Sequence, residues 1–172
     1  LTPNDIEAIT TNTSYDFISS VQRMNLTTGQ NSTVVTNLPS QAIQIAIEPN
    51  GDTALVSATG KLLRVNLTTG ETTIISDSID GAGPIAIEKS GRTALLAIPN
   101  GPATELLRVN LTSSTTAEHV ATINTSAGPI GIGVDPDGEN AVIAFTNEII
   151  RVNLQTGEQT TIRSMLCEEA NI

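Results

Sequence analysis

The sequence has few aromatic and sulfur-containing side chains. Its 172 residues include one cysteine, one tyrosine, two phenylalanines and no tryptophan. The single cysteine, Cys167, excludes a disulfide within the chain and a zinc site built from several thiolates. We expect Cys167 to be a free thiol, with a bond between two chains as the alternative. The apolar residues are mainly Ile, Val, Leu and Ala, which predicts a β-branched core rather than an aromatic one.

Positive charge and long hydrophobic runs are also scarce. Eight Lys and Arg residues stand against 18 Asp and Glu residues, and the formal net charge is −10. Such a surface repels phosphate backbones, so we expect no nucleic-acid partner. No run of about 18 apolar residues is present, and we therefore expect no membrane insertion. Because the chain begins at Leu1 and not at Met, we expect a processed or excised segment.

The usual catalytic motifs are absent from the sequence. His119 is the only histidine and lies in the polar stretch "TTAEHVA", where we expect a solvated side chain and not a general base. The sequence has no "GxSxG" nucleophile motif, and "GAGPIAI" opens a strand pattern where a phosphate-binding loop would open a helix. These absences lead us to expect no enzyme activity.

What the sequence does contain is a fourfold repeat. The phrase "LLRVNLTTGETTIIS" occurs in four similar copies, and each copy contains one asparagine at the same place. These asparagines are separated by 41, 44 and 43 residues: Asn25, Asn66, Asn110 and Asn153. A second phrase, "IAIEPNGDTALVS", recurs upstream of the last three copies. Repeats of this length are typical of solenoids and propellers. The repeats span approximately residues 1–40, 41–80, 81–126 and 127–172.

Each repeat has the pattern of four short strands joined by turns. Tight turns such as "PNGD" follow the first strand, and "TTGE" or "QTGE" precedes the last one, with Gly70 and Gly157 where a bulged hairpin needs a left-handed residue. No stretch has sustained helical periodicity. The sequence therefore predicts an all-β fold, a single propeller domain over residues 1–172 with four similar four-stranded blades.

These repeats resemble the blades of the virginiamycin B lyase, NHL and surface-layer YVTN propellers. The resemblance runs through "GPIAIEKSGRTALLA…LLRVNLTTGETTIIS" and its copies over nearly the whole chain. It implies architecture, but propeller blades carry many unrelated functions. The resembling lyases use paired histidines with a carboxylate, and this chain has only His119. Gluconolactonase-type propellers hold a central divalent metal with carboxylate and Asn side chains, and no such set stands out.

The two ends of the sequence resemble two halves of one inner strand. Leu1–Asp5 matches the end of a first strand and its turn, and Ile172 falls where a fifth first strand would begin. In one interpretation the halves meet within one molecule and close a ring. In a second they meet between molecules, so that each chain completes the next and a head-to-tail filament forms. In a third the sequence is a piece of a longer propeller array.

Asparagines in glycosylation sequons are numerous. Six satisfy N-x-[ST]: Asn12, Asn25, Asn31, Asn66, Asn110 and Asn124. Asparagine also starts turns by bonding its own backbone, and Asn153 keeps the repeat position without a sequon. If the protein is extracellular or on the cell surface, as we expect, the repeated sequons would carry sugar along one rim.

Two sets of charged residues recur at fixed repeat positions. The arginines lie two residues before the repeated asparagines: Arg23, Arg64, Arg108 and Arg151. The carboxylates end the first strand of three repeats: Glu48, Glu88 and Asp135. Because strands one and three of a meander run the same way, both sets should lie at one rim. We expect a ring of structural Arg–carboxylate pairs between strands or adjacent blades. A ligand-reading ring is the alternative.

One acidic turn raises the question of calcium. In "DPDGEN" three carboxylates stand at alternating positions, namely Asp135, Asp137 and Glu139. This spacing suits the oxygen ligands of a hard cation such as calcium. The corresponding phrases in other repeats are turns, and we favour a turn here too. A calcium site shared between chains, for instance with Glu168 and Glu169, is the alternative.

Taken together, these patterns predict a non-enzymatic extracellular or cell-surface propeller that acts as a structural and assembly module. Its expected partners are copies of itself, arranged head to tail, or another extracellular protein or glycan. Two other hypotheses stay open. One is a metal-dependent lactonase or lyase, and the other is a propeller that binds a peptide or glycan on one rim.

Overall fold

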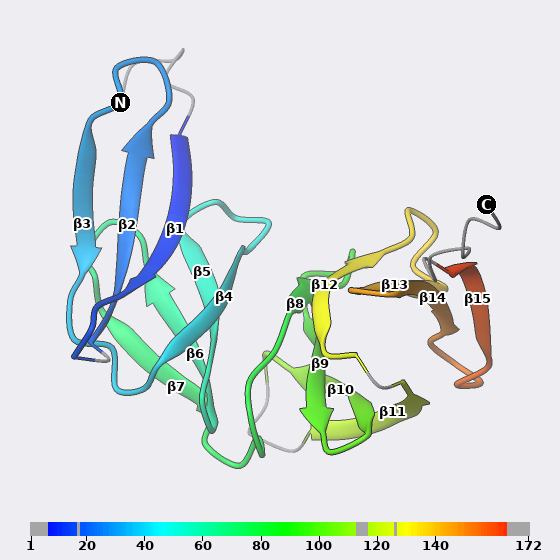
Figure 1. Cartoon of the computed structure of the whole chain (residues 1–172). Coiled ribbons are helices and arrows are strands. Elements are labelled where there is room, and N and C mark those ends of the chain that lie inside the picture. The colour runs from blue at the N-terminus through cyan, green and yellow to red at the C-terminus, as the bar shows by residue number, and fades with distance from the viewer. Residues whose placement is uncertain (1–6, 17, 113–116, 126, 165–172) are drawn as a thin grey trace, which may run out of the picture. The chain divides into compact units, whose positions relative to one another are not determined.

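A computed structural model of the chain contains only β-strands as regular structure in the residues it describes, which are 7–16, 18–112, 117–125 and 127–164. Figure 1 shows the strands as four separate antiparallel sheets. Each sheet lies within one of the predicted repeats. No helix long and apolar enough to cross a membrane is found in this described part.

The four sheets are named blades 1 to 4 in chain order. Blade 1 contains β1 (Glu7–Thr13), β2 (Ser19–Asn25) and β3 (Asn31–Val35). Blade 2 contains β4 (Ala42–Ile47), β5 (Thr53–Ala58), β6 (Lys61–Asn66) and β7 (Thr72–Ser76). Blade 3 contains β8 (Ile85–Ile87), β9 (Thr93–Asn100), β10 (Ala103–Asn110) and β11 (Ala117–Asn124). Blade 4 contains β12 (Pro129–Val134), β13 (Asn140–Phe145), β14 (Glu148–Asn153) and β15 (Gln159–Ser164).

Each blade is a meander in which every strand pairs with the next one along the chain. The prediction of an all-β, blade-type fold is confirmed. Blade 1 has three described strands, and they correspond to the second, third and fourth strands of the other blades. The inner strand that we expected to be split between the two termini falls on residues 1–6 and 165–172, which lie outside the described residues.

Asparagine and glycine shape the hairpin before the outer strand in blades 1, 2 and 4. In blade 2 the side-chain Oδ1 of Asn66 accepts hydrogen bonds from the backbone N–H groups of Thr68 and Thr69, at 2.9 and 2.8 Å. Gly70 then adopts a φ of 73°, and Gly157 in blade 4 has the same value. The predicted left-handed glycine is therefore confirmed at both positions, and only glycine adopts this conformation at little cost.

The outer strand of each blade carries an irregularity next to the same repeat position. The pairing between the last two strands shifts register by one residue beside Val34 in blade 1, Ile75 in blade 2, Val120 in blade 3 and Ile162 in blade 4. Such a bulge turns the local strand and redirects its carbonyl groups. These four residues therefore occupy equivalent places in their blades.

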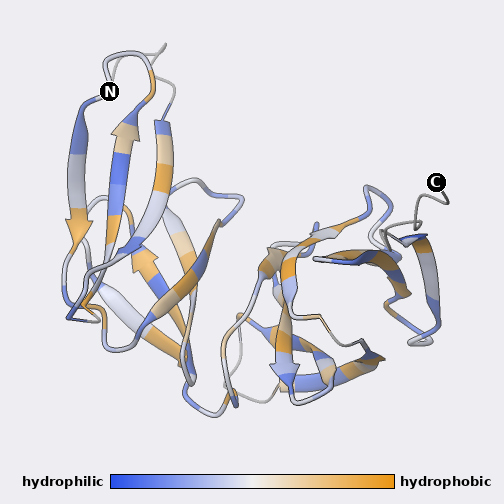
Figure 2. Ribbon diagram, viewed as in Figure 1, coloured by the Kyte–Doolittle hydropathy of each residue, from blue (hydrophilic) through white to orange (hydrophobic). Residues whose placement is uncertain are grey.

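The chain divides into two compact units, each with its own core. One unit holds blades 1 and 2, and the other holds blades 3 and 4. Figure 2 shows hydrophobic and hydrophilic residues alternating along many strands, as half-buried sheets require. Both cores are built from Val, Leu, Ile and Ala, and Phe145 is the one aromatic residue in the described clusters. The expectation of an aliphatic core holds for these clusters.

Candidate functional site

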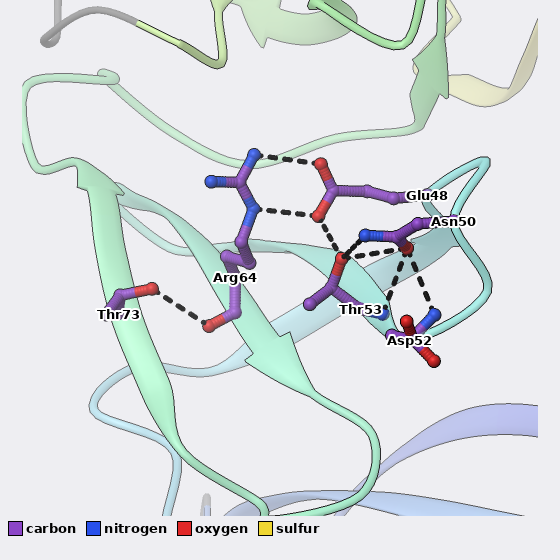
Figure 3. Close-up of polar contacts among 6 residues, drawn as sticks. All are labelled: Glu48, Asn50, Asp52, Thr53, Arg64 and Thr73. Carbon is purple, nitrogen blue, oxygen red and sulfur yellow. Dashed lines mark hydrogen bonds and ion pairs between the residues drawn. The ribbon is translucent and has the colours of Figure 1, made fainter.

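The repeated charged residues of blade 2 form a compact polar cluster. Arg64 donates from Nε to Glu48 Oε2 at 2.7 Å and from Nη2 to Glu48 Oε1 at 2.8 Å, and Figure 3 shows this two-pronged pair. Thr53 donates its hydroxyl to Glu48 Oε2 at 2.6 Å. The side chain of Glu48 is 7% exposed and that of Arg64 is 28% exposed. We call this arrangement of arginine, carboxylate and hydroxyl a polar triad.

Strand geometry brings the three side chains of this triad together. Glu48 directly follows β4, Thr53 begins β5, and Arg64 lies in β6. Because β4 and β6 both flank β5, residues from three consecutive strands meet at one end of the sheet. The "PNGD" turn holds Thr53 in place, since Asn50 Oδ1 accepts from the Thr53 backbone N–H at 3.3 Å and Asn50 Nδ2 donates to the Thr53 hydroxyl at 3.0 Å.

Blade 3 repeats the triad with the same residue types. Arg108 donates from Nε and Nη2 to the two carboxylate oxygens of Glu88, at 3.1 and 3.0 Å. The hydroxyl of Thr93 donates to Glu88 Oε2. The arginine and glutamate side chains are 23% and 14% exposed. The same chemistry is therefore built twice from the same sequence phrase.

Blade 4 contains a looser version of the triad. Arg151 Nη2 lies 3.2 Å from Asp135 Oδ2, and its side chain is 50% exposed. Asn140 takes the place of the threonine and donates from Nδ2 to Asp135 Oδ2 at 3.4 Å. Aspartate is one methylene shorter than glutamate, so the guanidinium has a single close contact in place of two.

Blade 1 supplies its carboxylate from a different strand. Arg23 Nε lies 3.6 Å from Glu7 Oε2. Glu7 pairs across from Asn25, just as Thr53 pairs across from Asn66, so the glutamate occupies the threonine position of the triad. The repeat alignment places Thr2 at the position of Glu48, which means that the two residue types are exchanged in this repeat. Sequence reasoning missed Glu7, although this alignment carried the signal.

The arginines also reach the backbone of the following blade within each unit. Arg23 Nη2 donates to the carbonyl oxygen of Leu67 in blade 2 at 2.9 Å. Arg108 Nη2 lies 3.5 Å from the carbonyl oxygen of Leu154 in blade 4. A single guanidinium thus joins its own blade's carboxylate to its neighbour's turn. Sequence patterns gave no signal for these contacts, because every residue has a backbone carbonyl.

The repeated asparagines of the sequons cap turns. Asn25 Oδ1 accepts from the backbone N–H groups of Thr27 and Thr28, and Asn153, which has no sequon, makes the equivalent bonds to Gln155 and Thr156. The turn role therefore does not depend on the sequon. Four sequon asparagines are exposed, namely Asn12, Asn31, Asn110 and Asn124, and two are half-buried, namely Asn25 and Asn66. Glycosylation stays a prediction at all six.

The acidic turn of blade 4 uses its carboxylates locally. Asp135 faces Arg151 and Asn140, and Asp137 Oδ1 accepts from the backbone N–H of Glu139 at 2.9 Å. Within the described ranges, no three His, Cys, Asp or Glu side chains are grouped as metal ligands would be. Calcium bound here would compete with Arg151 for Asp135. The calcium site stays a prediction, and Cys167, Glu168 and Glu169 lie outside the described residues.

His119 lies in a polar cluster on the outer strands of blade 3. Its Nε2 is 2.7 Å from Glu105 Oε2 and 3.0 Å from the hydroxyl of Thr122, and the histidine side chain is 55% exposed. The same hydroxyl donates to Glu105 Oε2 at 2.9 Å. The sequence analysis expected solvation here and missed the partner Glu105.

Comparison with known proteins gives structural relatives only. No protein-family model and no curated protein matches the chain. A chain of the nidogen–laminin complex matches with a TM-score of 0.77 and 16% identity over 94% of this chain and 62% of its own length. TolB from Acinetobacter baumannii matches with a TM-score of 0.65 and 12% identity over 95% of this chain and 45% of its own. These relatives decide the fold class. The chain has a β-propeller fold.

A third solved structure with a similar fold has a name that differs from those of the first two. A protein from Bacteroides uniformis, provisionally named a 6-phosphogluconolactonase, matches with a TM-score of 0.55 and 16% identity over 91% of this chain and 54% of its own length. The propeller described here spans less than two thirds of each of these three chains. Their names differ widely, so the shared fold carries no single function.

Proposed function

We propose that this propeller is a non-enzymatic structural module of the cell surface or extracellular space, and that it assembles with copies of itself. One observation carries the proposal. The arginine that recurs in every repeat is paired with a carboxylate of its own blade and, in two cases, donates to the backbone of the next blade. They are used to hold blades in register.

The burial of the triads supports a structural role over a ligand-reading one. A residue that reads a ligand keeps its donors open toward solvent, whereas the side chains of Arg23, Arg64 and Arg108 are only 23 to 28% exposed. In each of Arg64 and Arg108, two donors of the guanidinium fork are already bonded to a glutamate. A two-pronged pair of this kind fixes both distance and orientation.

The charge balance is consistent with a role outside the cell that involves calcium and sugar. Four of the eight cationic residues pair with four of the 18 acidic residues in the blades, which leaves 14 other acidic residues against four other cationic ones. Divalent cations would weaken the repulsion between such surfaces. The exposed sequons Asn12, Asn31, Asn110 and Asn124 could carry glycans without disturbing a core.

The first experiment is the mass of the chain in solution, measured by light scattering over a range of concentrations. With calcium present, we expect a mass of two or more chains that rises with concentration, and a smaller mass after chelation. A monomer at every concentration, with and without calcium, would contradict the assembly role.

A second experiment tests the enzyme alternative. A metal-dependent lactonase or lyase needs a tightly held ion, so we would measure the calcium and zinc content of the protein after gel filtration in metal-free buffer. We expect less than stoichiometric metal. One retained ion per chain would favour the enzyme alternative over the structural proposal.

A further inference from the structure

A repeated leucine marks the place where one blade docks on the blade before it. Each repeated asparagine is followed by a leucine, and within the two units Leu67 of blade 2 and Leu154 of blade 4 are each 6% exposed. The carbonyl groups of Leu67 and Leu154 accept from the arginine of the preceding blade. In blade 1 the equivalent residue, Leu26, is 53% exposed. Removal of a leucine side chain from water is favourable, so the exposure of Leu26 carries a free-energy cost.

The glycine of the same turn seats against the outer strand of the preceding blade. A Cβ atom placed on Gly70 would lie 2.4 Å from the carbonyl oxygen of Val34, and one placed on Gly157 would lie 3.0 Å from that of Val120. Both contacts are therefore close backbone approaches between successive blades. Gly29 in blade 1 has a similar φ of 72°, yet nothing lies within 4 Å of its Cβ position. Leu26 and Gly29 define what we call the leading face of blade 1.

Blade 4 is open at the complementary place. The side chain of Arg151 is 50% exposed, against 23% for Arg23 and 23% for Arg108. Ile162, the equivalent of Val34 and Val120 in the outer strand, is 52% exposed, and every residue of β15 is exposed. Val34 and Val120 instead pack against the cores of their units. Arg151 and Ile162 define what we call the trailing face of blade 4.

We infer that the leading face of blade 1 docks on the trailing face of blade 4 of a second copy of this chain. The inference rests on the proposed assembly function and names its surfaces. Both faces are halves of an interface that the chain already forms twice, between blades 1 and 2 and between blades 3 and 4. Docking buries Leu26 and Ile162 and gives Arg151 a backbone carbonyl to bind. Because the contact joins different surfaces, it repeats head to tail.

The internal interfaces supply the design of a cross-linking test. A Cβ atom on Gly70 would lie 3.7 Å from Val35 Cβ, and one on Gly157 would lie 3.8 Å from Ala121 Cβ. Disulfides join Cβ atoms about 3.5 to 4.5 Å apart. The equivalent pair across the inferred interface is Gly29 and Arg163. Both are changed singly, Gly29→Cys in one sample and Arg163→Cys in another, with Cys167→Ser in each.

The two single variants are mixed, oxidised and separated on a non-reducing gel. We expect a covalent dimer in the mixture at several times the amount formed by either variant alone. The double variant Gly157→Cys/Ala121→Cys, also with Cys167→Ser, is the matched control and should cross-link within one chain. No dimer in the mixture, with the control cross-linked, overturns the inference.

A double variant tests whether the leading face of blade 1 contacts blade 4 of a second copy or blade 4 of the same chain. The double variant Gly29→Cys/Arg163→Cys should give a ladder of covalent chains. If it gives only a cross-linked monomer, the two faces meet within one chain, and the docking of a second copy is wrong.

A substitution at the interface separates this inference from the proposed function. Leu26→Lys should weaken self-association by about tenfold or more, as loss of a central apolar anchor does. Ile74→Lys is the control, because Ile74 is 52% exposed and belongs to neither face. If the parent chain associates and Leu26→Lys associates equally well, the faces are wrong while the assembly function stands. If the parent chain never associates, both are wrong.

Discussion

Blades 2 and 4 contain equivalent polar triads that differ in the number of close contacts and in burial. In blade 2 two donors of Arg64 meet two oxygens of Glu48, whose side chain is 7% exposed. In blade 4 one donor of Arg151 lies 3.2 Å from Asp135, and the arginine is half exposed. Hydrogen bonds between charged groups strengthen as water is excluded, whereas exposed pairs contribute little. The repeat position therefore determines which side chains form the ion pair. The burial of the pair determines how much it stabilises the blade.

The largest contrast is expected at the turn glycines of these two blades. Gly70→Ala should lower the free energy of unfolding by about 3 kcal/mol, because a left-handed alanine is strained and its Cβ would meet the Val34 carbonyl oxygen at 2.4 Å. Gly157→Ala has the same strain but a contact of 3.0 Å, and should cost about 1 to 2 kcal/mol. Urea denaturation measures both. Equal costs would show that the close approach in blade 2 relaxes freely.

The triad arginines should give the next largest difference. Arg64→Leu leaves Glu48 buried without its partner, and we expect a loss of about 2 to 3 kcal/mol in unfolding free energy. Arg151→Leu removes an exposed single contact and should cost less than about 1 kcal/mol. The matched pair is measured by urea denaturation at low salt, because urea is uncharged and does not screen the ion pairs. An Arg64→Leu variant as stable as the parent chain would contradict the structural role of the triads.

The parts of this site that the sequence predicted are those with a distinctive residue at a fixed repeat position. Arg64 and Glu48 stood out because charged residues are scarce and recur, and the strand pattern placed both at one end of the blade. Thr53 did not stand out, because threonine is abundant throughout the chain. Glu7 was missed because its repeat exchanges the two residue types. The arginine contacts to Leu67 and Leu154 involve backbone oxygens, which no sequence pattern marks.

The threonine of the blade 2 triad has a smaller expected effect. Thr53→Val keeps the shape of the side chain and removes the hydroxyl that donates to Glu48 Oε2 at 2.6 Å. Because Arg64 still satisfies both carboxylate oxygens, we expect a loss of only about 1 kcal/mol in unfolding free energy. Thermal and urea unfolding would measure it. Thr73→Val is a suitable control, since that hydroxyl is exposed and lies 3.5 Å from the Arg64 carbonyl oxygen. A loss at position 53 no larger than the loss at position 73 would remove threonine from the triad.

The smallest expected effect comes from giving the triad of blade 4 the residue types of blade 2. The double variant Asp135→Glu/Asn140→Thr gives blade 4 the residue types of blade 2 and lets the longer carboxylate reach both donors of Arg151. We expect a gain of about 0.5 kcal/mol, because half of the arginine side chain stays in water and solvent screens the pair. Repeating the measurement in 1 M salt should abolish most of this gain, since the Debye length falls to about 3 Å at that ionic strength and exposed charges farther apart than this are largely screened. A gain above about 2 kcal/mol would mean that residue type, and not burial, sets the strength of the triad. The contrast between the two blades would then lie in chemistry alone.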